Sequence, residues 1–356
     1  MASTQAAKRS PHEKAELLMP RIALDAMGGD YAPAATIAGA LLALGELPAS
    51  TTIQLVGRED EIRAELQRQG GVPAAYESRV EIVHAPDVIE MTDKPSVAVR
   101  SKRESSMVVG LRMQADGQSD AFVSAGNTGA QMAASTVILR LHEGLTRPAI
   151  GTLVPTDRGV PLVMLDSGAN VDCSPQELLQ FGWLGAVYAE DILGRTNPAI
   201  GLLSVGEEPE KGSLAVKEAH ALLAASGLNF VGNVEGHDIP HGTCAHGALD
   251  VVVCDGFTGN VVLKLYESVA PMIFGLLVKF DVKQDGLESL LAMFDYAQYG
   301  GAPLLGVRGV SIICHGKSSP TAIKNALHVA SLAIAHDMSA HIGRSLRAAP
   351  VVHGAS

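Results

Sequence analysis

The residues best suited to chemistry in this sequence lie in short glycine-containing clusters that directly follow apolar runs. The first cluster consists of Asp25, Gly28, Gly29 and Asp30. Backbone N–H groups in such a turn, placed before a helix, can face an anion. Asp25 can equally hydrogen-bond the next loop, and Asp30 can act as a helix N-cap. An anion site and an ordinary turn are therefore equally good interpretations of this cluster.

A second cluster is a stronger candidate for an anion site. It combines two glycines for close backbone approach with two hydroxyls and an amide, from Ser124, Gly126, Asn127, Thr128 and Gly129. Its spacing is neither the GxGxxG of dinucleotide-binding turns nor the GK[ST] of a P-loop, so nucleoside triphosphate binding has no support. The alternative interpretation is a tight strand-to-helix turn.

Two further clusters share an arrangement of acid, glycine and asparagine. One contains Asp166, Gly168 and Asn170, and the other contains Asp255, Gly256, Gly259 and Asn260. Both follow wholly apolar runs that read as buried strands. Because ligands gather at the carboxyl ends of parallel strands, we expect the two loops to contribute to one pocket.

Basic side chains are needed wherever a dianion is held beside carboxylates. They occur in loops that also contain glycine or serine, at Lys102, Arg103, Lys211 and Lys317. His315, at the end of the last predicted strand, is the histidine best placed for proton transfer. Each of these groups also has a simpler interpretation, as a solvated surface charge or a structural histidine.

Two other kinds of site are not predicted. The sequence has no GxSxG turn, so nothing indicates an activated serine. One loop contains residue types that bind metals, but no second group of ligands accompanies it: His237, His241, Cys244 and His246. We therefore predict no metal site. The four cysteines form no CxxC pair, which favours reduced thiols and a cytosolic protein.

The elements that must position these loops follow a strand, glycine turn and helix pattern, which predicts a parallel sheet with crossover helices. Strands are expected over 22–24, 52–56, 121–123, 162–165, 200–203, 250–254 and 310–314. The segment over 265–298 breaks the pattern with two amphipathic stretches around a polar tip, and predicts a protruding helical hairpin. Apolar faces on both arms need a partner, and self-association is the commonest one.

Composition limits the class of protein. The formal net charge of -11 argues against a nucleic-acid binder, and 47% hydrophobic residues allow a sizeable core. We expect a disordered extension over 1–20, one α/β domain over 21–348 and a flexible tail over 349–356. The N-terminus lacks the apolar region of a signal peptide, and no run is predicted to span a bilayer.

Several motifs, in the same order, resemble those of the bacterial acyl-ACP:phosphate acyltransferases, the PlsX family. They are IALDAMGGD over 22–30, SSM over 105–107, SAGNTGA over 124–130, LDSGANVD over 165–172, DGFTGN over 255–260 and YGG over 299–301. The resemblance runs from about Arg21 to the C-terminal helix.

The resemblance implies a three-layer α/β/α fold with a largely parallel central sheet, related to isopropylmalate dehydrogenases and phosphate acetyltransferases. It implies a homodimer built partly on the helical hairpin, and no cofactor. The partners would be acyl carrier protein, inorganic phosphate and a membrane glycerol-phosphate acyltransferase that consumes acyl phosphate. The location would be cytoplasmic. Because the hairpin tip carries mixed charge, peripheral contact with the inner membrane face stays open.

The resemblance also implies direct attack of phosphate on the acyl thioester for phospholipid synthesis. We expect the glycine loops, with Lys102 or Lys211, to hold phosphate. Asn127 or Asn170 would donate to the oxyanion, and His315 would protonate the departing thiolate. Alanine at Asn127 or Lys211 should then cut turnover strongly. The alternatives are a phosphate acetyltransferase acting on short acyl-CoA and a non-catalytic regulator that binds an acyl carrier.

Overall fold

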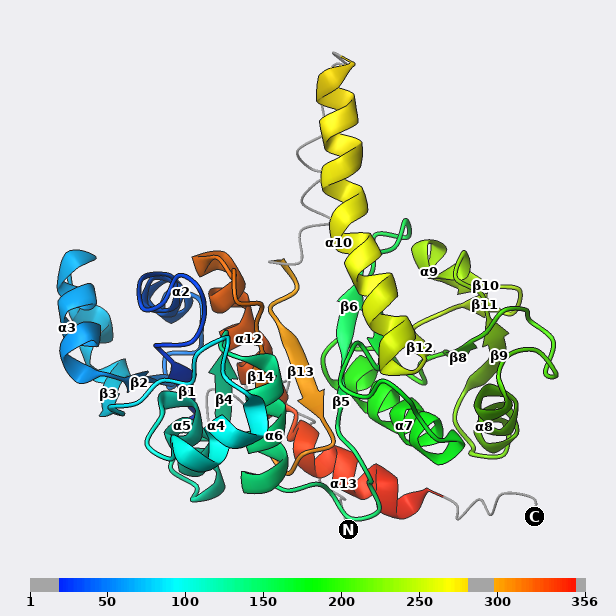
Figure 1. Cartoon of the computed structure of the whole chain (residues 1–356), viewed down its shortest axis with the longest axis horizontal. Helices are drawn as coiled ribbons and strands as arrows, with labels where there is room; N and C mark the ends of the chain where they lie inside the picture. Colours follow the sequence, from blue (N-terminus) through cyan, green and yellow to red (C-terminus); the bar gives the residue numbers. More distant parts are fainter. Residues whose placement is uncertain (1–18, 281–297, 350–356) are drawn as a thin grey trace, which may run out of the picture.

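The computed structural model describes residues 19–280 and 298–349 (Figure 1). Residues 1–18, the second arm of the expected hairpin over 281–297, and the tail from 350 lie outside the described residues. The α/β class is confirmed, but the strands divide between two large sheets instead of forming one central sheet. A small antiparallel pair completes the strands described, namely β10 (Thr243–Cys244) and β11 (Gly247–Ala248).

The first sheet has seven strands in the order β3-β2-β1-β4-β14-β13-β5. All its pairings are parallel except those of β13, which runs antiparallel to both neighbours. The strands are β1 (Arg21–Asp25), β2 (Thr52–Gly57), β3 (Val80–His84), β4 (Ala121–Ser124), β5 (Ala149–Ile150), β13 (Ala302–Leu305) and β14 (Ser311–Ile313).

Helices cover both faces of this sheet. One side carries α2 (Ala34–Leu44), α3 (Glu59–Arg68) and α12 (Pro320–Ala335). The other side carries α4 (Pro95–Ser101), α5 (Ser106–Ala115) and α6 (Thr128–Ile138). A short 3-10 turn, η1 (Ala74–Arg79), leads into β3. This sandwich is the three-layer arrangement that the family resemblance implied.

The second sheet has five strands in the order β6-β7-β12-β8-β9, parallel except for β6. The strands are β6 (Thr152–Val154), β7 (Leu162–Leu165), β8 (Ile200–Leu203), β9 (Phe230–Val234) and β12 (Val251–Val253). Its helices are α7 (Pro175–Asp191), α8 (Leu214–Ala224), α9 (Asp238–His241) and α10 (Gly256–Lys279), and α13 (Met338–Ala348) packs on α7.

The chain passes from the first sheet to the second at Gly151, between β5 and β6. The largest hydrophobic core contains buried residues of both sheets, including Ile22, Val123, Val163 and Val251. This shared core places the ends of the central strands of both sheets next to each other, where the sequence clusters were expected to meet.

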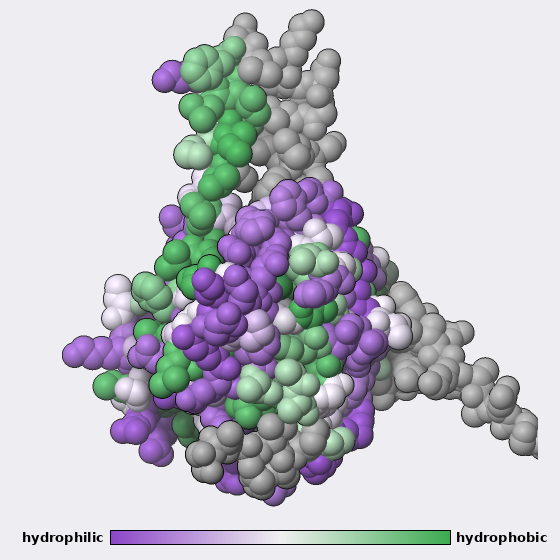
Figure 2. Space-filling model, turned by 90° about the vertical axis from the view of Figure 1, so that its right-hand side faces the viewer, coloured by the Kyte–Doolittle hydropathy of each residue, from purple (hydrophilic) through white to green (hydrophobic). Residues whose placement is uncertain are grey.

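Helix α10 projects from the body (Figure 1) and covers the first part of the hairpin expected over 265–298, whose second part lies outside the described residues. Figure 2 shows a hydrophobic surface along this projection, to which Leu265, Met272 and Phe280 contribute exposed side chains. Its 24 residues are long and apolar enough to cross a membrane by length and composition alone. The sequence analysis, which predicted no run that spans a bilayer, did not foresee one uninterrupted helix through Pro271.

Candidate active site between the two sheets

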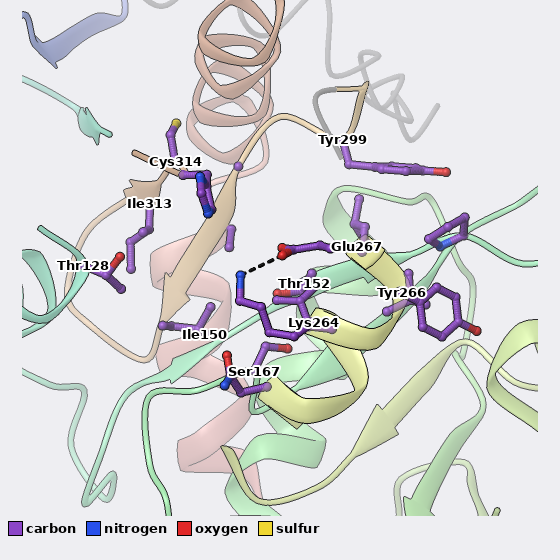
Figure 3. Close-up of a pocket in the computed structure, with 18 residues that line it drawn as sticks. Thr128, Ile150, Thr152, Ser167, Lys264, Tyr266, Glu267, Tyr299, Ile313 and Cys314 are labelled. Atoms are coloured by element: carbon purple, nitrogen blue, oxygen red, sulfur yellow. Dashed lines mark hydrogen bonds and ion pairs between the residues drawn. The ribbon is translucent and has the colours of Figure 1, made fainter. Parts of the chain in front are cut away.

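A cleft of about 320 Å³ lies where the chain crosses between the sheets (Figure 3). It is bounded by the first turns of α10, the start of α6, the start of β13 and the end of β14. The residues that line it are Thr128, Ile150, Thr152, Leu153, Val154, Pro155, Ser167, Asn260, Leu263, Lys264, Tyr266, Glu267, Tyr299, Gly301, Ala302, Ile313, Cys314 and His315.

The polar lining comes from the loops that the sequence singled out. Thr128 begins α6, where the first N–H groups have no partner within the helix. Ser167 and Asn260 come from the two loops of the acid, glycine and asparagine type. The structure therefore brings both loops to one pocket, as predicted.

His315 lines the cleft at the end of β14. Its Nδ1 atom accepts a hydrogen bond from the backbone N–H of Lys317 at 3.2 Å. In the neutral ring this arrangement leaves the proton on Nε2. A histidine whose Nδ1 is occupied in this way is suited to moving a proton through Nε2 within the cleft.

Asp166 holds the loop after β7 together from inside. Its Oδ1 atom accepts from the N–H groups of Ile150 and Ala169, and its Oδ2 atom accepts from the backbone and side-chain nitrogens of Asn170 at 2.6 and 2.9 Å. The carboxyl is fully buried. Burial raises the pKa of Asp166, although these four hydrogen bonds oppose the shift.

The start of α10 fits against this loop because of two glycines. A β-carbon at Gly256 would lie 2.5 Å from the Asn170 carbonyl oxygen, and one at Gly259 would overlap the Asp166 carbonyl oxygen. Asp255 caps the helix through the Thr258 N–H at 2.8 Å. These residues position α10 against the cleft, and none of the three lines it. Gly168 has a φ of +121°, which favours glycine at this turn.

The loop after β1 is joined to the loop after β4. Ser124 donates to Asp25 Oδ2 at 2.7 Å, and burial raises the pKa of Asp25. A β-carbon at Gly28 would lie 2.8 Å from the Gly126 nitrogen, so the two turns are in close contact. The predicted alternative for Asp25, a hydrogen bond to the next loop, is therefore confirmed.

Asp30 is not a helix N-cap. Pro33 occupies the N-cap position of α2 without a side-chain cap, and the Asp30 N–H donates to the Gly316 carbonyl at 2.7 Å. Gly29 lies beside the same carbonyl oxygen, because a β-carbon added at Gly29 would be 3.0 Å from it. The loop after β1 is thus held to the loop that follows His315.

Both asparagines assigned to the oxyanion have other partners. Asn127 caps α6 through the Ala130 N–H, and its amide nitrogen faces the carbonyl oxygens of Met91 and Asp93, both at 3.1 Å. Asn170 donates to the Pro148 carbonyl at 2.8 Å as well as to Asp166. Their side-chain donors therefore stabilise loops instead of facing the cleft.

The lysines predicted to hold phosphate do not line the cleft. Lys102 donates to Asp93 at 2.6 Å and to the Val88 carbonyl at 2.8 Å. Lys211 is exposed in the loop between β8 and α8. Gly129 packs on Pro95 rather than facing open space, since an added β-carbon would lie 2.8 Å from that ring.

Two charged residues of the cleft were missed from the sequence. Lys264 and Glu267 form an ion pair at 2.7 Å on the first turns of α10. They are spaced i, i+3 in an otherwise apolar stretch, and that interruption is the signal that could have identified them. Among the described residues, no group of three His, Cys, Asp or Glu side chains could hold a metal ion. His241 instead pairs with Asp157 at 2.6 Å.

Comparisons with known proteins agree with this architecture. A sequence model of the family described as fatty acid synthesis protein matches residues 20–341. The phosphate acyltransferase of Pelotomaculum thermopropionicum is 46% identical over 344 residues, which cover 93% of this chain and 96% of the relative. A phosphate acyltransferase of Desulfitobacterium hafniense is 48% identical, with 87% and 92% covered.

Solved structures support the fold at lower identity. A phosphotransacetylase from Streptococcus pyogenes superposes with a TM-score of 0.63 at 17% identity, covering 91% of this chain and 96% of that one. A phosphotransacetylase from Staphylococcus aureus gives a TM-score of 0.59 at 15% identity, with 91% and 98% covered. The family match and the curated relatives both span most of the sequence. The chain therefore belongs to the fatty acid synthesis protein family, and the two sequence relatives described above are phosphate acyltransferases.

Proposed function

We propose that this protein transfers a fatty acyl group from the thioester of acyl carrier protein to inorganic phosphate, within the cleft between the two sheets. Its relatives carry the name phosphate acyltransferase. The products would be acyl phosphate and free carrier thiol, and acyl phosphate would serve phospholipid synthesis. No cofactor is required for this reaction.

The observation that carries the proposal is the mixed character of the cleft. Hydroxyl, amide and imidazole groups come from Thr128, Ser167, Asn260 and His315, whereas the walls beside them are aliphatic. The aliphatic lining includes Ile150, Leu153, Val154, Leu263 and Ile313. Such a cleft suits a substrate with an apolar chain next to a polar reacting group.

In the proposed reaction, the main task of the protein is to position phosphate next to the thioester. An oxygen of the hydrogen phosphate dianion attacks the thioester carbonyl carbon, and the carbonyl oxygen becomes an oxyanion. The C–S bond then breaks, and the proton that phosphate loses reaches the departing thiolate. We assign His315 to this proton transfer, and Asn260, which replaces Asn127 and Asn170, to the oxyanion.

A covalent enzyme intermediate is not needed in this scheme. Among the described residues, Ser167 is the serine that lines the cleft, and its hydroxyl donates to the Met164 carbonyl at 3.2 Å. A hydroxyl that donates to a carbonyl oxygen has no base to remove its proton. The proposed scheme therefore takes phosphate itself as the nucleophile.

The wider setting is also proposed. The exposed apolar side chains of α10 favour a homodimer that covers this helix. We place the protein in the cytoplasm, where the acidic acyl carrier protein and phosphate are available. A membrane glycerol-phosphate acyltransferase would consume the product.

One assay separates the candidate functions. Purified protein is incubated with phosphate and either palmitoyl-ACP or acetyl-CoA, and acyl phosphate is measured. Acyl phosphate from palmitoyl-ACP supports the proposal. Product from acetyl-CoA alone would indicate a phosphate acetyltransferase, and no product from either donor would leave only an acyl-carrier-binding regulator.

A further inference from the structure

The cleft contains one group whose charge is suited to an inorganic anion. Of the described residues that line it, Lys264 is the only lysine or arginine. The remaining polar lining is hydroxyl, amide, imidazole and one carboxylate. A dianion entering this space would meet a single permanent positive charge.

Helix geometry directs Lys264 into the cleft. Asn260 and Lys264 are spaced i, i+4 on α10, so they lie one above the other on one face of the helix. Figure 3 shows the lysine side chain extending into the space between Ser167 and Thr152, with Glu267 at its tip. The amide assigned to the oxyanion and the ammonium group are therefore neighbours.

The ion pair leaves capacity for a ligand. Lys264 Nζ lies 2.7 Å from Glu267 Oε2, which occupies one of the three N–H donors of the ammonium group. The Lys264 side chain is 52% exposed, so its remaining donors can reach a bound anion. The Glu267 side chain, at 28% exposed, would place its negative charge close to that anion.

We infer that Lys264 holds the acceptor phosphate and that Glu267 is an internal counterion with which phosphate competes. This inference rests on the proposed function and replaces Lys102 and Lys211 in it. In the empty cleft, Glu267 balances the ammonium charge. When phosphate binds, it takes the free donors of Lys264 and is repelled by the Glu267 carboxylate, which weakens its binding.

The test measures the KM for phosphate and, separately, the binding of inorganic phosphate by calorimetry. Lys264→Ala should raise the phosphate KM about tenfold or more, because a charge-assisted hydrogen bond is lost, with little change in the KM for palmitoyl-ACP. Lys264→Arg should restore part of the binding. Glu267→Gln should lower the phosphate KM about threefold, since the repelling charge is removed. Lys217→Ala, at an exposed position on α8, is the matched control and should change neither constant.

The outcomes separate this inference from the proposed function. An unchanged phosphate KM in Lys264→Ala, with acyl phosphate formed normally, would overturn the inference and leave the function standing. Phosphate binding that depends on Lys264, without acyl phosphate from any donor, would support the inference and overturn the function. A phosphate KM that stays level or rises in Glu267→Gln would overturn the role of the counterion.

Discussion

Replacing Asp166 with asparagine should destabilise the protein strongly, because both carboxylate oxygens are saturated with donors. Each oxygen accepts two hydrogen bonds, from Ile150 and Ala169 on one side and from Asn170 on the other. In Asp166→Asn, the new NH2 group must face one of these pairs. Whichever way the amide turns, two hydrogen bonds are lost and two buried donors face another donor.

The size of the effect can be worked out from these contacts. Hydrogen bonds to a charged group contribute about 1.5–3 kcal/mol each, so two of them amount to about 3–6 kcal/mol. Burial of the charge works in the opposite direction, as the raised pKa of Asp166 indicates, and the neutral amide avoids that desolvation cost. We therefore expect the free energy of unfolding to fall by about 2–4 kcal/mol.

Urea unfolding of the purified variant measures this difference. Asp172→Asn is the matched control, since Asp172 is exposed at the end of the same loop and should change stability by less than about 0.5 kcal/mol. A loss below about 1 kcal/mol in Asp166→Asn, or equal losses in both variants, would refute the reasoning.

Three further predictions concern the loops around the cleft. Gly259→Ala should sharply reduce acyl phosphate formation and stability, because its β-carbon would overlap the Asp166 carbonyl oxygen. Gly275→Ala, on the same helix with nothing within 4 Å, should leave product formation unchanged and raise stability by about 0.5–1 kcal/mol. Burial raises the pKa of Asp25 above its ordinary 3.8, so the carboxyl binds its proton more tightly in the folded state than in the unfolded state. The free energy of unfolding should therefore fall as the pH rises from 3.8 through the pKa of the folded state. Asp25→Asn should flatten that part of the urea-derived pH profile, and an unchanged slope would show that another group is responsible. His315→Gln should lower kcat about 100-fold with little change in the phosphate KM, and a change confined to KM would mean that His315 binds rather than transfers protons.

The sequence predicted the local elements of the fold more closely than their assembly. The strand ranges 162–165 and 200–203 agree with β7 and β8, because short apolar runs that end at a polar residue, here Asp166 and Ser204, have few alternatives. The division into two sheets was not predicted. It depends on the break at Gly151, because the two-residue strand before it and the three-residue strand after it belong to different sheets, and such short strands have little periodicity.

The candidate site shows the same limit. The loops around Asp166 and Asp255 were correctly expected to meet, since strand ends share an edge of a sheet. Side-chain roles within the loops depend on contacts that spacing does not reveal. Asn127 occupies an N-cap, and Lys102 has a partner in Asp93, so neither faces the cleft. Lys264 and Glu267 were overlooked because one i, i+3 pair of opposite charges on a helix is usually a solvated surface pair.

The most direct test of the central claim is a single-turnover reaction that follows both products at once. The protein is mixed with palmitoyl-ACP, with and without phosphate, and acyl phosphate and free carrier thiol are measured over time. Direct transfer to phosphate predicts that both products form at the same rate and in equal amounts, and only when phosphate is present. Rapid release of thiol without phosphate, or thiol formed with no matching acyl phosphate, would contradict the account.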